Sequence, residues 1–311
     1  MSQNPTTNLA QNSEKEVEKT LEKTLEKIVI QAQEKLKNNP KKRIIIAVSG
    51  GSATGKTTQI ADLLNQKLVE NNLESQILSQ DNWQLGRLFV DQFDDLDSSE
   101  LDEKQRLLNN KIKKYKWDCP ENFDLENCKK TLKQILEKNE LETEMKTEME
   151  MKTEMETKTE NKAKPEIKID LQNELENKIQ IPHFDLTNAT RNGIQTFQPT
   201  QITIFEGLFA FFGELSDFDF DYRIYAQLPL WARLLKRYFR SKIQHKNNNS
   251  NQILKQILGT VINAHNDFVS LQAKNADLIV DLDYDFGKTV EILKLEEITT
   301  EKLENLEKWK N

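Results

Sequence analysis

The sequence predicts an α/β domain with a doubly wound, mainly parallel sheet of about five strands, flanked by helices and preceded by a helical N-terminal extension. Short apolar runs rich in β-branched residues, such as Ile44–Val48 and residues 201–205 (QITIF), are typical of strands buried on both faces. Longer segments with apolar residues at helical spacing separate these runs. Strands that alternate with helices in this way favour a parallel sheet.

Composition excludes several classes of protein. The 311 residues carry a formal net charge of −7, which gives no reason to expect a nucleic-acid partner. No apolar run reaches the roughly 18 residues that a membrane span needs, and the N-terminus has no secretory pattern. Cys119 and Cys128 lack metal-ligand spacing, which favours a reduced, cytoplasmic protein.

The first 41 residues are predicted to form a polar tail and an amphipathic helix. Residues 1–12 are polar and expected to be disordered. From Ser13 to Lys37, apolar residues recur at three- and four-residue steps, at Val17, Leu21, Leu25, Ile28, Ala32 and Leu36. This stripe can pack on its own domain or on a second copy in a homo-oligomer, and the first interpretation is favoured.

A glycine-rich loop follows the first strand. Gly50 to Thr57 spell G-x-x-x-x-G-K-[ST], the phosphate-binding P-loop pattern, and an apolar-faced helix begins after it. Lys56 can reach the β- and γ-phosphates of a nucleotide, and Thr57 can offer its hydroxyl to Mg²⁺. A plain glycine turn between a strand and a helix is the alternative, and the full motif in this context favours the P-loop. The predicted nucleotide-binding residues are Gly50, Gly51, Ser52, Ala53, Thr54, Gly55, Lys56, Thr57 and Thr58.

Two acidic residues follow predicted strands. Asp81 comes after the strand at residues 75–79, and Glu206 ends the strand at residues 201–205. The carboxyl ends of parallel strands form the ligand-binding edge of a sheet, so both carboxylates are expected beside the P-loop. Asp81 can accept a proton from an attacking hydroxyl or hold Mg²⁺ through water, although its position fits a turn aspartate equally well. Glu206 resembles the acidic residue of a Walker B strand.

The rest of the chain divides into ordered and low-complexity parts. A basic helix from about Leu230 to Ile243 places four cations on one side, which is either a solvated face or a lid over transferring phosphate: Arg233, Lys236, Arg237 and Arg240. Helices are also expected at residues 125–138 and 252–271, and a last strand at residues 277–281. Residues 42–138 and 178–287 are thus predicted to form one domain. Residues 139–177 are a charged, repetitive insertion, and residues 288–311 a helical tail.

These motifs together resemble the uridine kinase and phosphoribulokinase family of P-loop kinases. The resemblance rests on GGSATGKTT, on Ser79-Gln80-Asp81, on residues 117–124 (WDCPENFD) and on ITIFEGLFAF, and it covers roughly residues 42–136 and 178–285. It implies ATP as phosphate donor, Mg²⁺ held by Thr57 and Glu206, and a small-molecule acceptor. It also implies catalytic roles for Asp81, Lys56 and Arg240, and acceptor contacts from Asp118, Phe184, Arg191 and Arg237.

Two departures from the family pattern lie on the acceptor side. Phe184 replaces a tyrosine, and Ala189 replaces the histidine that would touch a pyrimidine base; the arginines of the lid segment are replaced at residues 245–248. The resemblance implies a kinase acting on a primary hydroxyl, first of all that of a uridine- or cytidine-type nucleoside. The alternatives are another acceptor, such as a sugar phosphate, glycerate or pantothenate, or a non-catalytic ATP-binding regulator.

Overall fold

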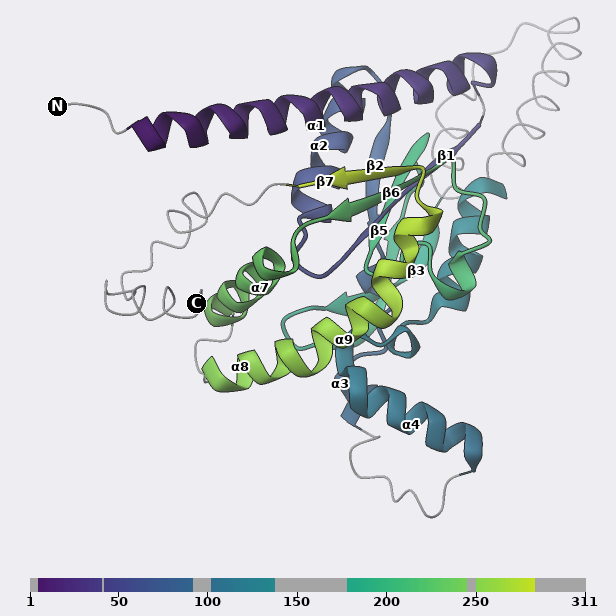
Figure 1. The fold of residues 1–311 in the computed structure, drawn as a ribbon. Helices are drawn as coiled ribbons and strands as arrows, with labels where there is room; N and C mark the ends of the chain where they lie inside the picture. Colours follow the sequence, from purple (N-terminus) through teal and green to yellow (C-terminus); the bar gives the residue numbers. More distant parts are fainter. Residues whose placement is uncertain (1–4, 41, 92–101, 138–177, 245–249, 283–311) are drawn as a thin grey trace, which may run out of the picture.

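The chain folds around a five-stranded parallel sheet, which confirms the predicted fold class (Figure 1). The computed structural model describes residues 5–40, 42–91, 102–137, 178–244 and 250–282. The strand order is β2-β5-β1-β6-β7. The strands are β1 (Ile44–Gly50), β2 (Ser75–Ser79), β5 (Ile202–Gly207), β6 (Tyr222–Gln227) and β7 (Leu278–Asp281).

Alternate residues of β1 point into two separate hydrophobic layers, as the two-residue period of a strand requires. Ile44, Ile46 and Val48 belong to a cluster that includes residues of α1 (Pro5–Asn38) and α2 (Asp62–Glu70). Ile45 and Ala47 belong to a second cluster, formed with a helix over residues 125–137 and the phenylalanine-rich segment at residues 205–220. Helices and loops therefore cover both faces of the sheet.

The N-terminal helix α1 packs on its own domain. It lies along the sheet beside α2 (Figure 1), and it buries Leu25, Ile28, Val29, Ala32 and Leu36. The prediction of disorder for residues 1–12 is wrong from Pro5 onward, because the helix begins at this residue. Proline is well suited to a first helical position, since its fixed φ matches the helix and its missing N–H has no partner there anyway.

An antiparallel hairpin forms a second, two-stranded sheet. Its strands are β3 (Ile179–Asp185) and β4 (Thr190–Phe197). The apolar pattern predicts only the first of them, since β4 buries just one of its eight residues, Phe197, and therefore has no buried stripe. The tip of the hairpin contacts the start of α3 (Arg87–Asp91), where the Arg87 N–H donates to the Ala189 carbonyl over 2.8 Å.

The helices beyond the sheet are more broken than the sequence predicts. After α7 (Leu230–Gln244), the expected helix at residues 252–271 is a succession of α, π and 3₁₀ turns. These turns are α8 (Ser250–Gln256), η6 (Ile257–Val261), α9 (Ile262–Ala264), η7 (His265–Val269) and η8 (Ser270–Asn275). The insertion at 139–177 and the tail at 288–311 lie outside the described residues. No helix among the residues described has the length and apolar character to cross a bilayer.

The remaining connections are short. η2 (Gln80–Trp83) follows β2, and α4 (Glu103–Tyr115) leads into η3 (Lys116–Asp118) and η4 (Pro120–Asn122). η5 (Gly213–Leu215) lies between β5 and β6. These elements carry several of the polar residues discussed below.

Asp221 ties α1 to the first strand of the sheet. Its side chain is only 7% exposed, and it accepts hydrogen bonds from Lys35 Nζ (2.9 Å), Lys42 Nζ (2.6 Å) and the backbone N–H of Ile45 (3.1 Å). One carboxylate thus satisfies a buried backbone donor and neutralises two cations that flank the start of β1.

We expect Asp221→Ala to destabilise the fold by about 1–3 kcal/mol, because the buried Ile45 N–H would lose its partner. Urea unfolding of wild type and variant measures this difference. Asp219→Ala is the matched control, since Asp219 is exposed in the same turn. Equal stability of Asp221→Ala and the control would show that Asp221 contributes nothing to the attachment.

Candidate active site

The P-loop is held tightly between β1 and η1 (Lys56–Ala61). A Cβ at Gly50 would lie 2.6 Å from the Ala226 carbonyl oxygen, so only glycine fits beside β6. Gly55 has φ 100°, in the left-handed region that favours glycine. The Thr54 hydroxyl donates to the Gly51 carbonyl over 2.9 Å and closes the loop on itself. The loop therefore leads directly into the unpaired N–H groups at the start of η1.

Glu206 lies at the carboxyl edge of the sheet and joins two neighbouring elements. Its Oε2 accepts a hydrogen bond from Thr57 Oγ1 (3.0 Å), and its Oε1 accepts one from Ser79 Oγ at the end of β2 (2.6 Å). β5 pairs with both β1 and β2, and Ser79 is the register partner of Glu206. Ser79 is not among the site residues predicted from the sequence, although its place at the end of a strand two residues before Asp81 is a usable signal.

Asp81 faces the same cavity as Glu206. It lies on η2, and Gln84 Nε2 donates to its Oδ1 over 2.8 Å. Asp81, Thr57, Glu206 and Arg240 all line a cavity of about 530 Å³. Asn82 and Gln195 line it too, joined by a hydrogen bond of 2.8 Å. The sequence pattern gives no sign of Gln195, because the exposed strand β4 brings it there.

Asp118 is a buried carboxylate within a group of cations. Burial raises the pKa of Asp118, whereas Arg237, Arg240 and Lys56 lower it. The pKa of Arg240 is lowered to about 10, first by burial and then by Arg237. Arg237 Nη1 donates to the Ser52 hydroxyl, and Arg240 Nη2 lies 3.5 Å from the same oxygen. The structure thus brings Lys56, Asp81, Asp118 and the two arginines of α7 together around the P-loop.

The hairpin residues expected to contact the acceptor, Phe184 and Arg191, contact other parts of the protein. Phe184 is 7% exposed, and Gly86 packs against its ring. Arg191 lies 3.4 Å from the Asp124 carboxylate, so it forms an ion pair at the start of the helix over residues 125–137. Ala189 adopts φ 52°, and its carbonyl receives the Arg87 N–H. These contacts fix the hairpin against the segment that carries Asp81.

Comparison with known sequences decides the family. The profile of the phosphoribulokinase/uridine kinase family matches residues 45–283. The chain belongs to this family. It is therefore a P-loop kinase, a phosphotransferase that uses ATP as donor and an alcohol group of a small molecule as acceptor.

Individual relatives are distant. A uridine kinase from Lactobacillus helveticus is 24% identical over 241 residues, which are 77% of this chain and 87% of that protein. A uridine kinase from Chlamydia pneumoniae is 26% identical over 245 residues, which are 78% and 82% of the two chains. The match to a uridine kinase from Staphylococcus haemolyticus is 30% identical over 103 residues, which are 33% of this chain and 49% of that protein.

Solved structures agree on the fold. The YGR205w protein superposes with a TM-score of 0.52 at 12% identity, covering 85% of this chain and 94% of that one. A kinase structure from Silicibacter sp. TM1040, whose description proposes a role in fructose transport, gives a TM-score of 0.50 at 17% identity. That match covers 81% of this chain and 97% of the other. At this identity the two matches support the shared fold alone.

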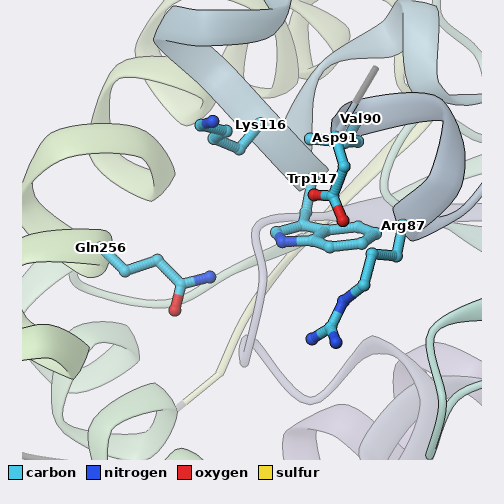
Figure 2. A pocket seen from close by; sticks show the side chains of 6 residues that line it. All are labelled: Arg87, Val90, Asp91, Lys116, Trp117 and Gln256. Atoms are coloured by element: carbon cyan, nitrogen blue, oxygen red, sulfur yellow. The ribbon is translucent and has the colours of Figure 1, made fainter. Parts of the chain in front are cut away.

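A second cavity of the kinase, of about 400 Å³, lies beside Trp117, the neighbour of Asp118 in sequence. Figure 2 shows the Trp117 indole at its centre, with the Arg87 guanidinium on one side and the Gln256 carboxamide of α8 facing it. Asp91, Lys116 and Val90 complete the lining. Two cations and one carboxylate leave this cavity with a net positive charge.

We expect Asp118→Asn to raise the melting temperature of the ligand-free kinase at neutral pH. The pKa of Asp118 is raised, so its ionised form carries a burial cost above that pKa, and the amide removes this cost. As pH falls through the raised pKa, wild-type Asp118 takes up a proton and the gain shrinks. Thermal scans of wild type and Asp118→Asn from pH 7.5 to pH 4 measure this difference in melting temperature, with the exposed Asp62→Asn as control. If Asp118→Asn melted below wild type at neutral pH, the attraction of the cations for Asp118 would outweigh its burial cost, contrary to this prediction.

Proposed function

We propose that this kinase transfers the γ-phosphate of ATP to a primary hydroxyl of a small molecule, with a uridine- or cytidine-type nucleoside as first candidate. One observation carries the proposal: Thr57 and Glu206 on the donor side share a cavity with Asp81 and Arg240. A donor phosphate on the P-loop and an acceptor hydroxyl at Asp81 would therefore meet in one space.

The proposed reaction assigns a role to each charged group. Asp81, oriented by Gln84, accepts the proton of the acceptor hydroxyl as its oxygen attacks the γ-phosphorus. The bond between the γ-phosphorus and the β,γ-bridging oxygen breaks, and ADP leaves. Lys56 and Arg240 stabilise the charge on the transferring group, while Arg237 holds the loop through Ser52.

The donor set at Thr57 and Glu206 fits Mg²⁺. A carboxylate and a hydroxyl 3.0 Å apart are hard oxygen ligands, and Mg²⁺ typically takes one or two protein groups together with phosphate oxygens and water. No cluster of three or more acidic, histidine or cysteine side chains occurs among the described residues, which agrees with so sparse a site. When bound, the ion would neutralise charge on the β- and γ-phosphates.

A nucleoside acceptor is supported by Asp118, whose pKa is raised by burial and influenced by Lys56, Asp81 and Arg240 around the P-loop. A buried carboxylate can accept two hydrogen bonds from the vicinal hydroxyls of a ribose. The Trp117 indole in the neighbouring cavity offers a flat apolar face for a base (Figure 2). The relatives named uridine kinase agree with this assignment.

One observation favours a different acceptor. The cavity beside Trp117 carries Arg87 and Lys116 against a single carboxylate, Asp91. Phe184 and Ala189 provide neither a hydroxyl nor an imidazole on the hairpin. An acceptor with an anionic group, such as a sugar phosphate, glycerate or pantothenate, would suit this charge and is the second candidate.

An acceptor panel tests the proposal. ADP release would be followed with uridine, cytidine, glycerate, pantothenate and ribulose 5-phosphate, against a sample without acceptor. ADP release that depends on one of these acceptors supports a kinase and identifies the class. ATP binding without any acceptor-dependent release across the panel would instead favour an ATP-binding regulator.

We expect Asp81→Asn to lower the turnover rate with the best acceptor by about 10²-fold or more, the usual scale for loss of a general base. The ATP affinity should stay within a few-fold, because the amide keeps the size and hydrogen bonding of Asp81. Steady-state kinetics and titration calorimetry measure the two quantities, with exposed Asp62→Asn as control. Weakened ATP binding with unchanged turnover would assign Asp81 to the metal or to structure.

A further inference from the structure

Arg233 is a buried cation that the proposed reaction does not use. It lies in the first turn of α7 and is 5% exposed. Its Nε donates to the Leu228 carbonyl over 3.1 Å. Across the described part of the chain, no carboxylate pairs with its guanidinium. Burial lowers the pKa of Arg233, and the opposing influence comes from Tyr225.

The guanidinium of Arg233 lies against the P-loop. A Cβ built on Gly51 would collide with Arg233 Nη1 and would lie 3.1 Å from Cζ. It would also lie 3.0 Å from His265 Nδ1, which is buried and lacks a hydrogen-bond partner within the described residues. Glycine at position 51 therefore leaves space for a charged group under the loop.

This arrangement costs free energy in the absence of a ligand. A buried charge without a counter-ion is unfavourable, and an apolar side chain of similar volume is often tolerated better in its place. His265 adds no second charge, because burial and Arg233 lower its pKa to about 4 and leave it neutral at physiological pH. The Arg233 guanidinium therefore remains a positive charge beside Gly51, the neighbour of Ser52, whose hydroxyl Arg237 already contacts.

We infer that Arg233 is a positioning residue for the donor nucleotide: it holds the P-loop at Gly51, and bound triphosphate supplies a counter-charge that no carboxylate of the described residues provides. The inference deepens the donor side of the proposed reaction and rests only on ATP as donor, not on the acceptor. Its action passes through the loop backbone and through charge at short range, in a region of low dielectric. The residue thus favours nucleotide binding at some cost to the free protein.

The variant Arg233→Met tests this inference, because it should weaken ATP binding without lowering the stability of the free protein. The variant keeps the length of the side chain and removes its charge. We expect the ATP dissociation constant, measured by calorimetry without acceptor, to rise about 10- to 100-fold. The melting temperature of the free protein should stay within a few degrees of wild type or rise, while the shift caused by ATP shrinks. Adenosine, which carries no phosphate, should lose little affinity.

Three further measurements separate positioning from structure. Arg233→Lys, which keeps the charge, should recover part of the ATP affinity. Lys242→Met, in the last turn of the same helix, should leave binding unchanged. With any active acceptor, Arg233→Met should raise the KM for ATP and leave kcat at saturating ATP near wild type.

Other results would overturn the role. If Arg233→Met fails to fold, Arg233 is a structural cap of β6. The same conclusion follows if the variant melts far below wild type but binds ATP with normal affinity. Equal losses of ATP and adenosine affinity would also exclude charge compensation by phosphate. Inactivity across the acceptor panel with these binding effects intact would refute the proposed reaction and leave this inference standing.

Discussion

The position of β1 between β5 and β6 is the constraint on which the site depends. The register pairs Ser49 with Gly207 on one side and Gly50 with Ala226 on the other. The P-loop therefore leaves the sheet at the point where β5 presents Glu206 and where β6 turns toward α7. A side chain at Gly50 would push β6 away, and a side chain at Gly51 would displace Arg233. Close packing of glycine backbone thus holds the donor loop, the acidic strand end and the basic helix together.

Charge around the loop is unevenly balanced in the free protein. Lys56, Arg237 and Arg240 have a nearby carboxylate in Asp118, whose raised pKa shows that burial outweighs their attraction. Within the described residues, Arg233 has the Leu228 carbonyl and the partly buried, neutral imidazole of His265 beside it. Several of these groups therefore cost stability on their own and gain from an anionic ligand. This is the pattern expected where binding, rather than folding, has determined the choice of residues.

The strand and loop that form the donor side could be placed from the sequence because their signals are local. The strand, the glycine loop and Thr57 lie within fifteen residues, and β-branched runs identify the sheet. The sequence predicts less where contacts join distant segments. Val29 is buried although the predicted apolar stripe omits it. Strand β4 has too few buried residues for its sequence pattern to predict a strand. The π turns after Gln256 and the place of Arg233 under Gly51 depend on packing between elements, which no periodicity encodes.

The acceptor side is also built from contacts between distant segments, so its specificity is difficult to predict from the sequence. Its cavities combine side chains from η2, η3, α3, α7, α8 and the hairpin. A motif can mark Asp118 as a group for hydroxyls, but the charge beside Trp117 comes from Arg87 and Lys116, which belong to separate segments. A polar site rejects a wrong substrate strongly only when its own buried groups are left unpaired. An acceptor that pairs the Asp118 carboxylate and also satisfies the cations beside Trp117 should therefore be preferred, whether the group that meets the cations is the carbonyl edge of a base or an anion.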